Sequence, residues 1–173
     1  MSEENNTNAA FIANWKSKVT PIVDNLTSIF EELELSPENR DFFIRMNILL
    51  KEISDSSINI QNLGPELNRF CQLMRIISKY AVRIYDAAIL NICVAILYDG
   101  LDIIKKIVKN IIDGNNGFKK DFSFDVFATR VRWLKGKIKG IENQLSNNNP
   151  IELENDIEVS LESMEKILCG FET

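Results

Sequence analysis

The sequence predicts an all-α protein, an antiparallel bundle of five or six helices with a buried central helix. Apolar side chains recur at alternating intervals of three and four along most of the chain, which is the period of one helix face. Segments rich in polar residues, glycine or proline interrupt this pattern near residue 36 and at 54–64, 114–117 and 146–149, so the helices fold back on one another. No segment shows the two-residue alternation of a β-strand.

The first predicted helix has an apolar seam over residues 12–33 that stays in phase across Pro21. Proline removes one helical hydrogen bond, so we expect one kinked helix here rather than two separate ones. Residues 1–8 have no apolar side chain after Met1, and we expect them to form a disordered tail. A chain of 173 residues fits one domain, which we assign to residues 9–173.

The second predicted helix begins at Ser36–Pro37, where serine would cap the helix and proline would take its first position. Its buried stripe is Phe43, Met46, Leu50 and Ile53.

The third predicted helix begins near Pro65 and is the longest. From residue 87 to residue 98 it is apolar on almost every side, which is typical of a helix at the centre of a bundle. This run is shorter than the roughly 18 apolar residues of a membrane span, and Asp86 and Asp99 flank it. We expect a break or a bend at Gly100, followed by a basic amphipathic helix over 101–113.

Two further helices complete the predicted bundle. One begins near Ser123, the other at Asn149–Pro150, and Gly114 to Gly117 form the strongest break before them. Their seams are Phe124, Phe127, Val131, Leu134 and Ile138, and Leu161, Met164, Leu168 and Phe171.

Composition excludes most catalytic chemistry. The chain has no histidine, the commonest general acid–base group and metal ligand. Its three cysteines are too scattered for a zinc pattern, and no glycine-rich phosphate loop occurs. We therefore predict a protein that is not an enzyme, with no catalytic residue, metal or cofactor. Sparse cysteines and the lack of a signal-peptide pattern at the start favour a cytoplasmic location.

Charge is unevenly distributed along the chain, whose net charge is −5 and so does not favour nucleic acid. Residues 101–140 carry 10 basic and 4 acidic side chains, a net charge of +6, while residues 141–173 carry 1 basic and 8 acidic ones, a net charge of −7. From the basic block we select a candidate interaction surface: Lys105, Lys106, Lys109, Arg130, Arg132, Trp133 and Lys137. The competing interpretation is a solvated lysine face, with Trp133 on a second buried face of its helix.

Gly136 and Gly140 lie four residues apart in the same block, so we expect either close approach of another helix or a tolerated bend there.

These patterns predict a protein-interaction module, an adaptor or a regulatory protein, with a protein partner. The alternative is a membrane-acting helical bundle of the lipid-binding or pore-forming type, which would use the apolar 87–98 segment and the basic 101–113 helix. The seams fit a monomer and a homodimer equally well.

Overall fold

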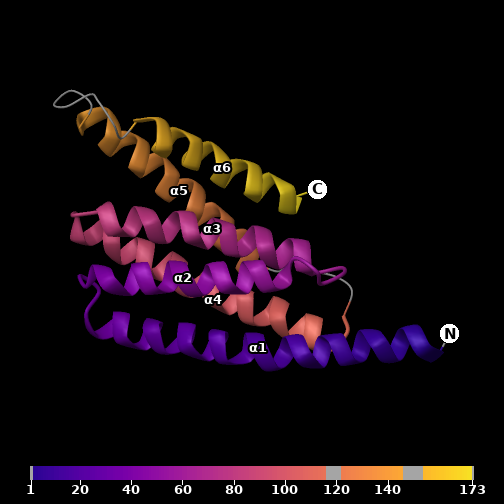
Figure 1. The fold of residues 1–173 in the computed structure, drawn as a ribbon. Helices are drawn as coiled ribbons and strands as arrows, with labels where there is room; N and C mark the ends of the chain where they lie inside the picture. The colour runs from indigo at the N-terminus through magenta and orange to yellow at the C-terminus, as the bar shows by residue number, and fades with distance from the viewer. Residues whose placement is uncertain (1, 116–121, 146–153, 173) are drawn as a thin grey trace.

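The computed structural model of the chain describes the backbone of residues 2–115, 122–145 and 154–172, and the side chains of 9–115, 124–140 and 161–171. These residues form six α-helices and no strand (Figure 1). The helices are α1 (Ser2–Leu35), α2 (Arg40–Ser57), α3 (Gly64–Arg83), α4 (Ala87–Ile112), α5 (Phe122–Leu145) and α6 (Glu154–Glu172). The predicted all-α antiparallel bundle is confirmed.

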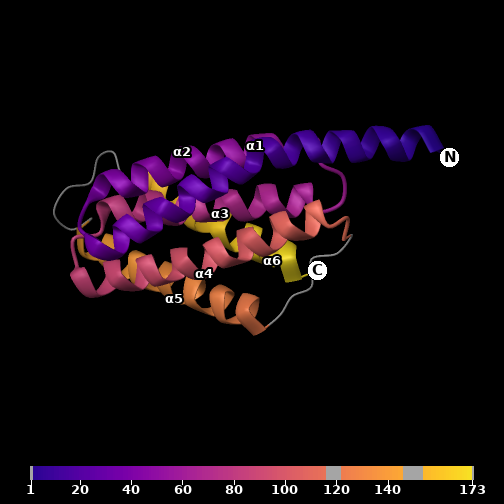
Figure 2. The same ribbon diagram turned by 90° about the horizontal axis from the view of Figure 1, so that it is seen from below.

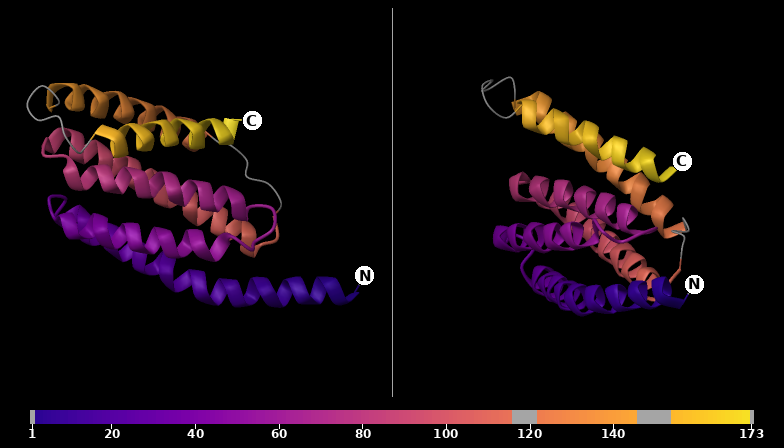
Figure 3. Two further views of the ribbon diagram at one scale, coloured as in Figure 1. Left: turned by 45° about the horizontal axis from the view of Figure 1, so that its top comes forward. Right: turned by 45° about the vertical axis from the view of Figure 1, so that its right-hand side comes forward.

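Contacts between the helices form two four-helix rings that share one pair. Successive helices contact one another, and α1 also contacts α4, so α1 to α4 close the first ring. Because α3 also contacts α6, helices α3 to α6 close the second ring. Figure 3 shows the shared α3–α4 pair between the α1–α2 pair and the α5–α6 pair.

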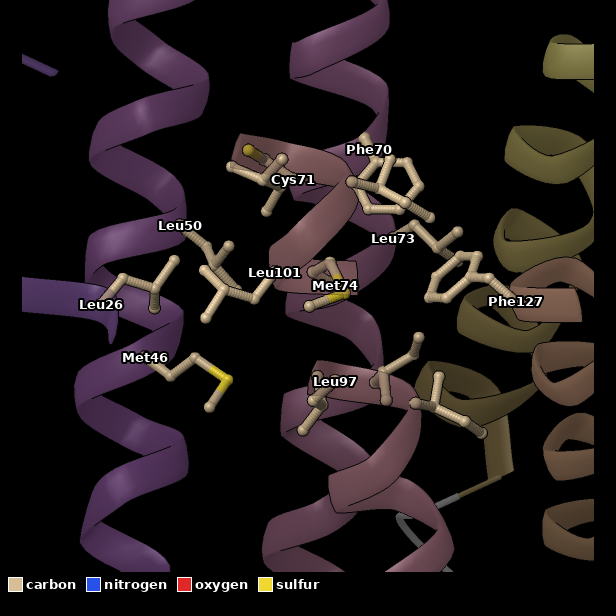
Figure 4. Close-up of a cluster of buried hydrophobic side chains, with 14 of the residues drawn as sticks. Leu26, Met46, Leu50, Phe70, Cys71, Leu73, Met74, Leu97, Leu101 and Phe127 are labelled. Atoms are coloured by element: carbon tan, nitrogen blue, oxygen red, sulfur yellow. The ribbon is translucent and has the colours of Figure 1, made fainter. Parts of the chain in front are cut away.

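One hydrophobic core runs through both rings. Figure 4 shows Leu26 of α1, Leu50 of α2, Met74 of α3, Leu101 of α4 and Phe127 of α5 in one cluster. The seams predicted from the sequence supply most of this core. The following seam residues are buried: Trp15, Val19, Leu26, Ile29, Leu33, Phe43, Met46, Leu50, Ile53, Phe124, Phe127, Val131, Leu134, Ile138, Leu161, Met164, Leu168 and Phe171. On α3, Leu67, Phe70, Met74, Ile77 and Ala81 are buried at the same three- and four-residue spacing.

Helix α1 is continuous through Pro21, as predicted, and Figure 2 shows its axis changing direction along its length. It begins at Ser2, so the backbone of residues 2–8, for which we predicted a disordered tail, continues the helix. The N-terminal part of α1 projects beyond the other helices (Figures 1 and 2).

The start of α2 differs from the prediction. Asn39 is the N-cap, since its Oδ1 accepts a hydrogen bond from the backbone N–H of Asp41 at 3.1 Å. The backbone N–H of Ser36 donates to the carbonyls of Glu32 and Leu33, so Ser36 ends α1. The predicted start at Ser36–Pro37 was wrong because this pair closes one helix instead of opening the next.

The third predicted helix is two helices, with the break at 84–86 and none at Gly100. Asp86 caps α4 by accepting hydrogen bonds from the backbone N–H groups of Ala88 and Ile89 at 2.9 and 3.0 Å. The Arg40 guanidinium donates to the carbonyl of Ala81 in the last turn of α3 and to that of Ile84, the residue that caps the end of this helix. Residues 87–112 then form one uninterrupted helix. The single helix predicted through residue 98 was wrong, and of the break or bend expected at Gly100 the break is absent.

Helix α4 is less buried than its composition indicates. Leu90, Cys93, Ile96 and Leu97 are buried, but Ile92 is only partly buried. Within residues 87–98, the exposed positions are Ala87, Ala88, Asn91 and Ala95. Three of these four exposed positions carry the small side chain of alanine, which costs little in water, and α4 is the buried central helix of the predicted bundle.

The remaining predicted helix starts are only partly described. Gly114 has φ +72°, a left-handed backbone conformation that favours glycine, and it follows the end of α4. The predicted start at Asn149–Pro150 and the second half of the 114–117 break lie outside the described residues, as does the side chain of Ser123.

The glycine that permits close packing is Gly100. A Cβ built there would collide with Sδ and Cε of the buried Met74 and lie 3.3 Å from Cε2 of Phe127. At Gly136 and Gly140, a built Cβ would meet no described atom within 4 Å. The close helix approach expected at Gly136 and Gly140 is therefore absent from the described structure, and the sequence gave no sign of the one at Gly100.

We predict opposite responses to Gly→Ala at these sites. Gly136→Ala should raise the free energy of unfolding by about 0.5–1 kcal/mol, because alanine is the better helix former and space is open. Gly100→Ala should lower the free energy of unfolding, since overpacking costs about 1–3 kcal/mol, which is more than alanine gains as a helix former. Urea unfolding followed by far-ultraviolet circular dichroism measures both; an equal gain at the two positions would contradict the packing at Gly100.

Candidate functional site

A cleft opens between α4 and α5, where part of the predicted interaction surface lies. Its volume is about 510 Å³, and its lining consists of Asp99, Asp102, Ile103, Lys105, Lys106, Val126 and Arg130. Arg130 of α5 forms an ion pair with Asp99 of α4, which holds the two helices together at the edge of the cleft. The cleft is therefore of mixed charge, with one cation already neutralised.

The lysines of α4 differ in their surroundings. Lys105 and Lys106 line the cleft, whereas Lys109, one helical turn further on, is exposed and does not. Neither Lys105 nor Lys109 forms an ion pair with any residue in the described part of the chain. These two ammonium groups can therefore meet an external carboxylate without first giving up one of the described ion pairs.

Trp133 lies on the same face of α5 as two cleft residues. Val126, Arg130, Trp133 and Lys137 follow one another at intervals of four, three and four, which places them along one side of a helix. The Trp133 side chain is 41% exposed, and Nζ of Lys137 lies 5.4 Å from its ring centroid, a cation–π contact. Trp133 is thus not buried on a second core face, which was the competing interpretation.

Arg132 is on a different side of α5. Its Nε lies 3.2 Å from Oε1 of Glu165 on α6, and Nζ of Lys135 lies 2.9 Å from Oε2 of the same carboxylate. Of the seven predicted surface residues, the structure brings Lys105, Lys106 and Arg130 together at the cleft and places Trp133 and Lys137 beside Arg130 along α5. Arg132 faces α6 instead.

The Glu165 carboxylate is stabilised in its charged form. The hydrogen bond from Lys135 is the largest cause that lowers its pKa, the hydrogen bond from Arg132 adds to it, and burial opposes both. This carboxylate connects α6 to α5. Through it, the acidic C-terminal segment neutralises part of the charge of the basic block.

The described side chains offer little reactive chemistry. Burial raises the pKa of Cys93 to about 12 and that of Cys71 still further, so both thiols stay protonated and poorly nucleophilic at neutral pH. Cys169 is exposed, and its Sγ lies 3.8 Å from Oε1 of Glu165. Among the described residues no group of three or more cysteine, aspartate or glutamate side chains is arranged to hold a metal ion.

Sequence analysis missed the acidic half of the cleft. Asp99 and Asp102 belong to it because α4 and α5 run antiparallel at this point, and no local pattern reveals that pairing. The spacing of Val126, Arg130, Trp133 and Lys137 was the one available signal for a continuous face on α5.

We predict that Glu165→Gln lowers stability only where the carboxylate is charged. A carboxyl whose pKa is lowered by folding stabilises the protein above its ordinary pKa near 4.5, and that contribution is lost as the pH falls through the lower, folded value. Each half-exposed ion pair is worth about 0.2–1 kcal/mol. Urea unfolding at pH 7 should show a difference between the variant and wild type that shrinks below pH ~4; a constant difference would show that the ion pairs are not its source.

Comparison with other proteins finds no protein-family model, curated protein or solved structure that matches this chain. One described helix, α4, is long and apolar enough to cross a membrane when judged by length and composition, a criterion that the core helix of a soluble protein also meets. The function has to be argued from the surface of the protein itself.

Proposed function

We propose that this protein is a non-enzymatic helical interaction module that binds a protein partner through the α4–α5 surface. We use this name for the cleft residues Lys105, Lys106, Val126 and Arg130 of α4 and α5, together with Trp133 and Lys137.

The exposed Trp133 is the observation that carries the proposal. A tryptophan ring that remains in water lacks the favourable free energy that burial of its apolar surface would provide. Trp and Arg are also the residues most enriched at the energetic centres of interfaces. Here the ring stands between two cations of the same helix face, Arg130 and Lys137, and next to an open cleft. A partner that covers the ring would bury apolar area and meet cations with its own carboxylates or carbonyls.

The six-helix framework supports a docking role. The residues that present the surface lie on two helices whose inner faces belong to the core, so the surface is ordered before a partner arrives. Preorganisation of this kind reduces the entropy lost on binding.

We predict that Trp133 is required for partner binding and Phe11 is not. Both side chains are 41% exposed aromatics, Phe11 on α1 and Trp133 on α5, so Phe11→Ala is a matched control. A benzophenone amino acid at position 133 identifies the partner by photo-crosslinking, with position 11 as the control site. In the purified complex, Trp133→Ala should weaken binding about thirtyfold, equivalent to about 2 kcal/mol, and Phe11→Ala should leave the affinity unchanged.

The outcome that contradicts this proposal is equal crosslinking at the two positions, or equal affinity of the two alanine variants. A crosslink from position 133 to a second copy of this chain would make the partner a homodimer subunit, and light scattering gives its mass.

The composition of α4 favours a second candidate, the membrane-acting bundle. Helix α4 has 26 residues and an apolar stretch long enough to cross a membrane, and it includes the basic residues Lys105, Lys106 and Lys109. Against this, 44% of that stretch is buried in the bundle, so exposing it would require the core to open.

We expect the wild-type protein to stay in the supernatant when it is centrifuged with neutral or anionic vesicles. If the membrane candidate were right, it would sediment with anionic vesicles at low salt only, since each lysine near the surface contributes about 1 kcal/mol. Lys105→Glu, Lys106→Glu and Lys109→Glu combined would then abolish sedimentation. Lys16→Glu, Lys18→Glu and Lys166→Glu combined are a control of equal charge change at exposed sites.

A further inference from the structure

The outer face of the α2–α3 hairpin has a second concentration of exposed apolar and basic side chains. Hydrogen bonds fix which residues of the two antiparallel helices are neighbours. Nδ2 of Asn47 donates to the carbonyl of Arg75 at 3.0 Å and to Oγ of Ser78 at 3.1 Å. Nearer the end of α3, Arg40 donates to the carbonyls of Ala81 and Ile84. The first two turns of α2 therefore lie beside the last two turns of α3.

The apolar part of this face consists of Ile44 and Ile48 on α2 and Tyr85 just after α3. The two isoleucines are 51% and 54% exposed and lie one helical turn apart. Tyr85 is 91% exposed, and the Arg40 guanidinium carbon lies 5.7 Å from its ring centroid. A single exposed isoleucine is ordinary on a protein surface, but two on successive turns near an exposed tyrosine form a patch that packing inside this chain does not explain.

Positive charge is concentrated on the α3 side of this patch. Helix α3 carries four basic side chains and one acidic one, a net charge of +3, in a chain whose net charge is −5. Lys79 and Arg83 are exposed, and neither has an ion-pair partner among the described residues. On α2, Lys51 pairs with Asp55 at 2.6 Å, so that carboxylate is already occupied.

We propose that this outer face is a docking site for an acidic amphipathic helix of a partner protein. Two apolar side chains of that helix, one turn apart, would cover Ile44 and Ile48. Its carboxylates would meet Lys79 and Arg83, which form no ion pair with a described residue. We call the set Ile44, Ile48, Lys79, Arg83 and Tyr85 the hairpin face.

Charge decides between this occupant and two others. An anionic bilayer is flat and would also meet the exposed carboxylates of Asp41 and Glu52 on α2, whose three acidic and three basic side chains sum to a net charge of zero. A narrow helix can cover Ile44 and Ile48 and direct its carboxylates toward Lys79 and Arg83 on α3. A second copy of this chain would have to offer its acidic C-terminal helix α6, but the described apolar stripe of α6, from Leu161 to Phe171, is buried in its own bundle.

The hairpin face shares no residue with the α4–α5 surface, so the two sites can be tested separately. The probe is a capped helical peptide of about four turns, with leucines at helical spacing on one face and glutamates flanking them. The same peptide with lysine in place of glutamate is the charge control. Titration into the full ¹⁵N-labelled chain, followed by amide chemical shifts, locates the binding site and gives the affinity.

We expect the glutamate peptide to shift amides of α2 and α3 around the hairpin face, with affinity that falls as salt rises. Lys79→Glu combined with Arg83→Glu should weaken binding about tenfold or more, and Ile44→Ser combined with Ile48→Ser should do the same. Lys16→Glu combined with Lys18→Glu, an equal charge change at exposed sites on α1, should have no effect. Trp133→Ala should also have none, so that failure of this site and failure of the α4–α5 surface are told apart.

Four results of the peptide titration would overturn the proposal: no binding at millimolar peptide, equal binding of the lysine peptide, shifts that map to α4–α5, or full affinity after Lys79→Glu and Arg83→Glu. So would sedimentation with phosphatidylserine vesicles, or a dimer by light scattering, that the same double variant abolishes. Circular dichroism of each variant confirms that it is folded, which is expected because all the substituted side chains are exposed.

Discussion

The contact between α3 and α4 at Met74 and Gly100 is the constraint on which the rest of the structure depends. These two helices belong to both four-helix rings, so their separation sets the geometry of α1–α2 on one side and α5–α6 on the other. The absent side chain at Gly100 leaves room for the buried Met74, and Phe127 of α5 packs into the same place. Protein cores are close-packed, so one added methyl group here would be felt in both rings.

Ion pairs in the second ring show how the basic and acidic segments of the chain are used. Arg130 connects α5 to α4 through Asp99, and Arg132 and Lys135 connect α5 to α6 through Glu165. Three cations of the basic block are therefore employed within the fold. Lys105 and Lys109 on α4 and Lys137 on α5 form no ion pair with a described residue, and partner binding can draw on these.

The two proposed surfaces have a common physical character. Each combines exposed apolar or aromatic area with cations, at Trp133 and Lys137 in one case and at Ile44, Ile48 and Lys79 in the other. Both favour acidic partner segments, which a protein of net negative charge attracts only where local positive charge is concentrated. Cys71 and Cys93 are buried and contribute packing to this framework. Because burial raises their pKa values, both thiols stay protonated and are poor nucleophiles at neutral pH.

The sequence by itself determined the all-α class and most of the core, because apolar spacing of three and four reports which face of a helix is buried whatever that face packs against. Tertiary structure alone decided where helices stop and which charges are free. Ser36–Pro37 has the composition of a helix start but closes α1. At the break after α3, two carbonyls accept hydrogen bonds from Arg40, a residue more than forty positions away in sequence. Gly100 reads as a helix breaker yet lies inside α4, where the packing of Met74 and Phe127 requires it, while Gly136 and Gly140 have open space around them. Tertiary structure also decided which residues of the candidate surface lie together. Trp133 and Arg132 are neighbours in sequence, but successive residues of a helix point in directions about 100° apart. Trp133 therefore faces solvent, while Arg132 faces Glu165.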